Sequence, residues 1–309
     1  MFKNLGLLFL TKPSPSLSKE ELEFYQSLSF KNFIFFKDHF VEDFSFYLRR
    51  LKENLKELKF LAVDQEGGKV CRIPGEFDSP LEISRRFFKK GEGIVKSWAE
   101  KIALSLKSQG LNLNLAPCLD LGDEEAPEFL KERTFGKDSD LVTYLAKIFI
   151  KVHKEHQIFT CIKHFPGLGK VKVDPHKELP VLEKIEKEDL KPFEKLSSEV
   201  SFIMTTHLVV FSLDRLPMTL SEKGVEFLRR VLEFKGLILT DDLTMEGLKA
   251  WELPERIILS LVAGHTLLIF GGNWEELLKV LEDLKPEVEK GKILRERIKE
   301  SLFILETLS

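Results

Sequence analysis

The 309-residue chain has few cysteines, few tyrosines and tryptophans, and no surplus of charge of either sign. Its three cysteines, Cys71, Cys118 and Cys161, are an odd and scattered set, which argues for reduced thiols and against a disulfide framework. With 47 Lys and Arg against 50 Asp and Glu, the net charge of -3 offers no basic excess to attract nucleic acid or an anionic membrane. Only three Trp and three Tyr occur, too few for an extended aromatic platform that binds polysaccharide.

Long hydrophobic runs are also missing. The apolar run Leu5–Leu10 is too short to span a membrane, and no small-residue cleavage site follows it. We therefore expect a soluble, cytoplasmic protein with no nucleic-acid or membrane partner, acting as a monomer. Hydrophobic residues make up 43% of the chain, enough for a sizeable core. We expect one domain over residues 1–309.

Short apolar runs alternate with amphipathic helical patterns along the chain. The predicted strands are Leu5–Leu10, Phe33–Phe36, Phe60–Val63, Leu111–Leu115, Phe159–Ile162, Ser201–Thr205, Gly236–Thr240 and Thr266–Phe270. The clearest predicted helices are Lys19–Leu28, Val41–Leu55, Ile94–Ser108, Asp140–His156, Ser221–Leu232, Leu253–Ala263 and Trp274–Leu284. Eight buried strands separated by helices predict an α/β fold, a single (β/α)8 TIM barrel, with an open doubly wound sheet as the alternative. The tail Pro286–Ser309 is predicted to add one C-terminal helix.

Polar residues follow several of these strands directly. Asp64 follows the third strand, 114–120 the fourth, Lys163 and His164 the fifth, and His207 and Asp241 the sixth and seventh. A barrel gathers the carboxyl ends of its strands into one ring, whereas an open sheet concentrates them at one switch point. The distribution over five strands favours the barrel.

The stretch 163–176 reads KHFPGLGKVKVDPH and opens the longest predicted irregular segment, 163–180, with 71–84 the next longest. Its Pro-Gly-x-Gly turn predicts a surface loop, and such long loops are often mobile lids. Asp174 stands two residues before His176, so its carboxylate can accept a hydrogen bond from the imidazole and fix the tautomer. The alternative is an ordinary solvated histidine, as we also expect for His153 and His156 on a polar helix face.

Three further motifs carry charged groups. In TDDLTM, residues 240–245, the strand-end carboxylate of Asp241 can attack an anomeric carbon, while Asp242 suits a helix N-cap. The motif DQEGG, residues 64–68, runs on to Arg72, and its alternative interpretation is a glycine turn with a solvated Glu66. The motif ERTFG, residues 132–136, contains Arg133. The alternative to a binding role for Arg133 is a surface ion pair with a neighbouring carboxylate, which would add little stability.

Together these motifs resemble those of family 3 glycoside hydrolases, in particular the β-N-acetylglucosaminidases that recycle cell-wall sugars, over about residues 5 to 275. The resemblance implies that Asp241 is the nucleophile and that Asp174 and His176 form the acid/base pair. It implies the following substrate-binding set, in which His207 orients its neighbours: Asp64, Arg72, Arg133, Lys163, His164, Met245 and His207. It implies neither cofactor nor metal. The family usually has histidine where Leu168 stands and a small polar residue at Pro175, which puts the behaviour of the loop in question.

The implied activity is that of a retaining exo-glycosidase of the cell-wall recycling pathway. It would release terminal non-reducing β-N-acetylglucosamine from muropeptides or disaccharides through a glycosyl-aspartate. Alternatives on the same scaffold are a β-glucosidase-like enzyme and a phosphorylase that uses phosphate in place of water. Two further alternatives are a sugar-binding barrel without turnover and a metal-dependent hydrolase in which His164, His176 and His207 converge.

Overall fold

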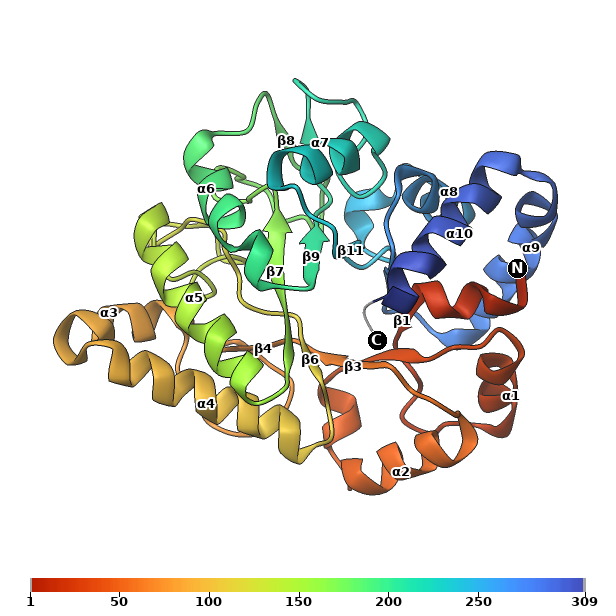
Figure 1. The fold of residues 1–309 in the computed structure, drawn as a ribbon, viewed down its shortest axis with the longest axis horizontal. Coiled ribbons are helices and arrows are strands. Elements are labelled where there is room, and N and C mark those ends of the chain that lie inside the picture. Colours follow the sequence, from red (N-terminus) through yellow and green to blue (C-terminus); the bar gives the residue numbers. More distant parts are fainter. Residues whose placement is uncertain (1, 308–309) are drawn as a thin grey trace.

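The computed structural model describes residues 2–307, and parallel strands lie at its centre with helices around them (Figure 1). The strands of the central sheet are β1 (Phe9–Thr11), β2 (Asn32–Phe35), β3 (Phe60–Val63), β6 (Leu113–Asn114), β7 (Phe159–Phe165), β9 (Phe202–Thr205), β11 (Leu237–Leu239) and β12 (Leu268–Phe270). They are ordered β11-β9-β7-β6-β3-β2-β1-β12, and every neighbouring pair is parallel.

The sheet closes between its two end strands, β11 and β12. Leu239 forms a parallel bridge with Leu267, and the Thr240 amide donates to the Leu267 carbonyl at 3.1 Å. The Thr266 amide donates to the Ile238 carbonyl at 2.9 Å. The predicted (β/α)8 barrel is therefore confirmed, and the open sheet is excluded.

The helices cover the outside of the barrel. They are α1 (Lys19–Ser27), α2 (Phe44–Asn54), α3 (Pro80–Lys90), α4 (Glu92–Ser108), α5 (Ser139–Glu155), α6 (Lys187–Leu196), α7 (Glu222–Leu232), α8 (Leu253–Ala263), α9 (Trp274–Lys290) and α10 (Lys292–Thr307). Several begin where a side-chain oxygen accepts a first-turn amide, as Asp43 does for α2 and Ser221 for α7. None of the helices within 2–307 combines the length and apolar character needed to cross a bilayer.

Apolar side chains fill the barrel at the amino ends of its strands. The rings of Phe60, Phe159 and Phe202 meet with centroids 4.9 to 5.8 Å apart. Leu305 of α10 joins the apolar cluster inside the barrel, and its carbonyl accepts a hydrogen bond from Lys59. This packing closes the amino end of the barrel. A pocket is therefore expected at the carboxyl end, where the active sites of such barrels lie.

The first predicted strand is partly wrong. A 3-10 helix occupies Phe2–Leu8, and β1 begins only at Phe9. The amide of Gly6 donates to the carbonyl of Leu28 at 2.9 Å, and a side chain at Gly6 would collide with the Phe30 ring. Periodicity cannot separate a strand from a buried helical turn in so short an apolar run.

Other boundaries also differ. β7 continues to Phe165, so the irregular segment begins three residues later than expected. Helix α3 begins at Pro80 and so takes in the last five residues of the predicted loop 71–84, and α6 was not among the clearest predicted helices. Helix α9 continues through Pro286 to Lys290, and the tail helix starts at Lys292. The last two residues of the predicted tail helix lie outside the described part of the chain.

His153 is not solvated as predicted. It is buried, its Nδ1 lies 2.9 Å from the Phe149 carbonyl and its Nε2 lies 3.1 Å from the side-chain Nδ2 of Asn114. Burial lowers its pKa to about 3. His153 follows Phe149 by four residues and therefore shares the face of α5 that packs on the barrel. His156, at the end of α5, is half-buried 3.6 Å from Glu100.

Candidate active site

A pocket of about 470 Å³ opens among the segments that follow the strands. Every predicted site residue except His207 lines it: Asp64, Arg72, Arg133, Lys163, His164, Asp174, His176, Asp241 and Met245. These residues come from segments far apart in the sequence, and only barrel closure brings them together. A pocket of this size, with convergent charged groups, suits a small polar ligand.

One wall of the pocket is a network of ion pairs around Glu66. The guanidinium of Arg133 donates to both Glu66 oxygens at 2.8 Å, and Lys163 Nζ lies 2.6 Å from Glu66 Oε1 and 2.8 Å from Asp64 Oδ1. Arg72 Nη2 is 3.8 Å from Asp64 Oδ2. Glu66 is 2% exposed, so the solvated alternative for it was wrong, and Arg133 has a buried partner rather than a surface one.

The network keeps its members charged. Burial alone would raise the pKa of Glu66, but the cations of Arg133 and Lys163 outweigh it and hold the pKa well below its usual range. Burial would lower the pKa of Lys163, and the carboxylates of Asp64 and Glu66 raise it above its usual range instead. The side chain of Asp64 is 15% exposed and presents its remaining lone pairs to the pocket. Charged groups held in fixed positions can form hydrogen bonds with the hydroxyls of a sugar.

Asp241 lies on a turn directly after β11. Its amide donates to the Thr205 carbonyl at 3.1 Å, and its Oδ1 accepts the Asp242 amide at 2.8 Å. Burial would raise the pKa of Asp241, but the nearby imidazoles of His207 and His164, together with the hydrogen bond from the Asp242 amide, outweigh it and lower the pKa, which favours the carboxylate. An ionised carboxylate at a pocket wall can act as a nucleophile.

The turn behind Asp241 is held by two buried groups. Asp242 does not cap an α-helix as considered above, because its Oδ1 accepts the amides of Thr244 at 2.9 Å and Gly271 at 3.0 Å. His207 is buried with Nε2 2.8 Å from the Asp242 carbonyl and Nδ1 2.8 Å from the hydroxyl of Thr219. His207 therefore lies behind the pocket wall, where it orients the turn and does not reach a ligand.

Asp174 and His176 enter the same pocket from the segment after β7. Asp174 Oδ1 accepts the His176 amide at 3.0 Å and lies 2.8 Å from the ring Nδ1. Burial would raise the pKa of Asp174, but its hydrogen bonds with His176 lower it. A carboxylate acceptor assigns the Nδ1 proton and leaves Nε2 as the free end of the ring. The side chain of His176 is 60% exposed, so solvent reaches it.

The loop of His176 packs directly on the segment after Asp241. A side chain at Gly247 would collide with the carbonyl oxygen of Pro175 and contact that of Glu178 at 3.4 Å. Close backbone approach at Gly247 thus sets the distance between the two segments.

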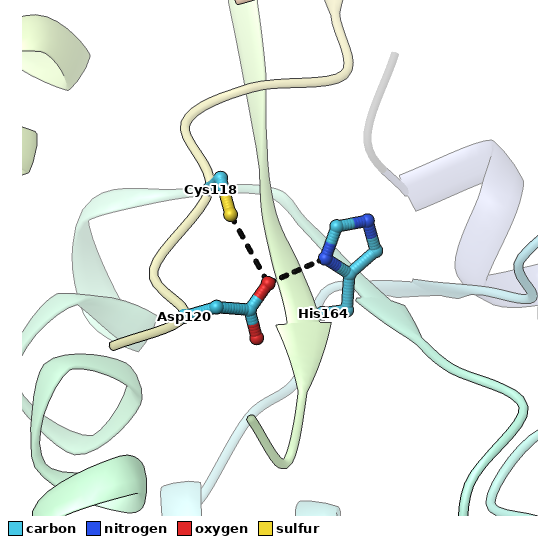
Figure 2. Close-up of side chains that lie close together, drawn as sticks. All are labelled: Cys118, Asp120 and His164. Carbon is cyan, nitrogen blue, oxygen red and sulfur yellow. Dashed lines mark hydrogen bonds and ion pairs between the residues drawn. The ribbon is translucent and has the colours of Figure 1, made fainter. Parts of the chain in front are cut away.

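The alternative in which His164, His176 and His207 converge on a metal has no support in the described residues. His164, His176 and His207 each have a separate partner within the described structure. Among residues 2–307, one group has metal-ligating atoms within 4.8 Å of one another: Cys118, Asp120 and His164 (Figure 2). Asp120 Oδ2 lies 2.6 Å from His164 Nδ1 and 3.0 Å from Cys118 Sγ. Zinc ligands in a tetrahedral site lie about 3.3 Å or more apart, so this group fits hydrogen bonding better than a metal.

Sequence reasoning missed two buried acids, Glu66 and Asp120. Glu66 follows β3 by three residues and Asp120 follows β6 by six, which was the available signal, but nothing local distinguishes a buried acid from a solvated one. Other pocket residues without a predicted role include Lys69, Glu128 and Lys131.

Residues 42–307 match the Glycosyl hydrolase family 3 N terminal domain. The chain is 32% identical over 296 residues to a beta-hexosaminidase from Photobacterium profundum, with 92% of this chain and 87% of that protein covered. Among solved structures, NagZ from Neisseria gonorrhoeae in complex with N-trifluoroacetyl-D-glucosamine has a TM-score of 0.80 at 27% identity, covering 95% of this chain and 89% of that one. A glycoside hydrolase family 3 beta-N-acetylglucosaminidase from Paenibacillus sp. str. FPU-7 has a TM-score of 0.89 at 24% identity. It covers all of this chain, which spans 62% of that one.

Proposed function

This chain belongs to glycosyl hydrolase family 3 and is a glycoside hydrolase, and on that premise we propose that it is a retaining exo-β-N-acetylglucosaminidase. The observation that carries the proposal is that Asp241 and the Asp174–His176 pair, from segments after different strands, line one pocket. A nucleophilic carboxylate and a proton donor on either side of a glycosidic bond are the two groups that retention requires.

The first step breaks the glycosidic bond. Asp241 attacks the anomeric carbon and forms a glycosyl ester, while Nε2–H of protonated His176 gives its proton to the departing oxygen. Asp174 accepts the Nδ1–H bond throughout and stabilises the imidazolium before the transfer.

The second step restores the enzyme. The neutral Nε2 takes a proton from water as the water oxygen attacks the anomeric carbon, and Asp241 leaves as the carboxylate. Two inversions at that carbon retain its configuration. Since the protein supplies the nucleophile, the 2-acetamido group of the sugar is bound and does not attack.

The ionic wall supports a role in sugar binding. Asp64, Arg72, Arg133, Lys163 and His164 line the pocket. The side chain of Arg72 is 27% exposed in the pocket lining, so its guanidinium can reach a ligand oxygen. The relatives named above are a beta-hexosaminidase, a beta-N-acetylglucosaminidase and NagZ with N-trifluoroacetyl-D-glucosamine bound. We infer that the natural substrates are muropeptides or disaccharides with a terminal N-acetylglucosamine, encountered during cytoplasmic recycling of the cell wall.

Trapping with a fluorinated N-acetylglucosaminyl donor followed by peptide mapping tests the proposal. The label is expected on Asp241, and a label on any other residue would overturn the assignment. Binding of N-acetylglucosamine without hydrolysis of an aryl β-N-acetylglucosaminide would identify a sugar-binding barrel without turnover. Faster hydrolysis of the matching β-glucoside would instead identify a β-glucosidase.

Phosphorolysis is a second candidate on the same pocket. A neutral histidine, unlike a carboxylate, does not repel an incoming anion, and Lys131 adds positive charge to the lining, where Lys69 is paired with Glu128. Product analysis with and without millimolar phosphate separates the two reactions, since phosphorolysis yields a sugar 1-phosphate and hydrolysis yields the free sugar.

A further inference from the structure

Asp120 has no predicted role, and it does not line the pocket. It is buried on the segment after β6 and accepts three hydrogen bonds. Its Oδ2 lies 2.6 Å from His164 Nδ1 and accepts from Cys118 Sγ at 3.0 Å, as Figure 2 shows. Its Oδ1 accepts the Leu168 amide at 2.7 Å. Burial would raise the pKa of Asp120, but these donors, His164 first among them, lower it and favour the carboxylate.

The Oδ2 atom of Asp120 determines how His164 faces the pocket. The other ring nitrogen, Nε2, lies 3.3 Å from Nη2 of Arg133. A guanidinium only donates, so Nε2 must accept and the single ring proton must sit on Nδ1, toward Asp120. A carboxylate at this position therefore selects one neutral tautomer of His164 and holds the plane of the ring.

The Oδ1 atom of Asp120 holds the beginning of the loop that carries His176. Leu168 lies in the turn that follows β7, where the Gly167 amide also donates to the His164 carbonyl at 2.7 Å. The side chain of Leu168 is 2% exposed, so both its backbone and its side chain are fixed. From this anchored turn the chain runs to Asp174 and His176.

We propose that Asp120 is a positioning residue that couples sugar binding to the placement of the general acid, because one carboxylate orients His164 and anchors the loop of His176. The inference rests on the proposed function. It predicts that a single change behind the pocket weakens two events at once, namely binding of the sugar and protonation of the leaving group.

The test is Asp120→Asn, with Asp189→Asn as the matched control. Asp189 is also buried against this turn, with its Oδ1 3.0 Å from the position that a side chain at Gly169 would occupy, but it has no bond to His164. An asparagine offers one acceptor oxygen, so its NH₂ must face either the His164 Nδ1–H or the Leu168 N–H. The control perturbs the turn and leaves the histidine alone.

Two kinetic results are expected. Asp120→Asn raises KM for an aryl β-N-acetylglucosaminide, and it lowers kcat/KM for an alkyl analogue with a poor leaving group by a further factor of about 10 to 100. In a His176→Ala background this further loss disappears, because the group that Asp120 places is gone. Asp189→Asn produces neither effect. Equal losses in the two Asn variants, or an undiminished loss in the His176→Ala background, would overturn the proposal.

A measurement on the wild-type protein keeps the inference independent of folding and of turnover. Histidine-selective ¹⁵N NMR should show His164 protonated on Nδ1, and a His164 protonated on Nε2 refutes the coupling whether or not Asp120→Asn folds. If the wild type fails to cleave either glycoside, the proposed function fails. The coupling is then judged by whether Asp120→Asn, unlike Asp189→Asn, shifts the ring signals of both His164 and His176.

Discussion

The contact between Gly247 and the loop of His176 gives the sharpest test of the proposed chemistry. Gly247 lies in the short segment after Asp241, and a Cβ there would fall within 3.0 Å of the Pro175 carbonyl oxygen, closer than real Cβ contacts come. Ordinary contact begins at 3.4 Å, so Gly247→Ala must move the Asp174–His176 loop and the segment of Gly247 apart by roughly half an ångström to one ångström.

The size of this shift determines the expected loss. A misplacement of 1 Å in a catalytic geometry can cost about 100-fold in rate, so we expect Gly247→Ala to lose about 10-fold or more where proton donation limits the reaction. The assay compares kcat/KM for an alkyl and a nitrophenyl β-N-acetylglucosaminide. The alkyl substrate needs the proton and should show the whole loss, whereas the nitrophenyl substrate should lose less than about threefold.

Two other glycines provide controls. A Cβ at Gly271 would collide with a carboxylate oxygen of Asp242, so Gly271→Ala disturbs the turn of Asp241 and should slow both substrates alike. A Cβ at Gly93 meets nothing within 4 Å, so Gly93→Ala should leave both rates unchanged. Equal slowing of the two substrates by Gly247→Ala would refute the assignment of His176 as the proton donor.

The remaining predictions concern buried charge. Glu66→Gln leaves Arg133 and Lys163 short of a buried counter-charge and should lower the free energy of unfolding by about 3–5 kcal/mol in urea denaturation, and a loss below about 1 kcal/mol would contradict the ionic wall. Burial raises the pKa of Asp189 from 3.8 to about 6, so the native state holds the extra proton between these values and loses stability as pH rises through them. Asp189→Asn should therefore gain about 1–3 kcal/mol at pH 7 and little at pH 4, and melting curves with the same gain at both pH values would refute this. A strong chelator should leave activity intact, since Cys118 and His164 are each hydrogen-bonded to Asp120, and a loss of activity reversed by zinc would show the opposite.

Local pattern was enough for the barrel and for the polar groups that directly follow its strands, whereas the roles expected of Arg72, Arg133 and His176 came from the resemblance to family 3 glycoside hydrolases. Strands such as Phe60–Val63 and Gly236–Thr240 are short apolar runs bounded by polar residues, and eight of them with helices between leave few topologies. Asp64 and Asp241 follow such runs directly, so closure of the sheet brings them to one face without further information.

The predictions that were wrong share a cause. Whether a polar side chain is buried is decided by partners that are distant in the sequence. From the sequence, Glu66 looks like a surface charge. In the structure it is buried because Arg133, 67 residues later in the chain, donates to both of its oxygens. His153 lies among polar neighbours in sequence, yet it faces the barrel through the same turn of α5 as Phe149. Pro286 suggests a helix boundary, but α9 continues past it.

The sequence by itself determined the order of the eight barrel strands and the types of chemical group that follow them, because both depend on neighbours within a few positions. Tertiary structure alone decided which acids are buried, which tautomer His164 adopts, and how closely the loop of His176 approaches the turn of Asp241. Those properties depend on hydrogen bonds and ion pairs between segments that only closure of the barrel brings into contact.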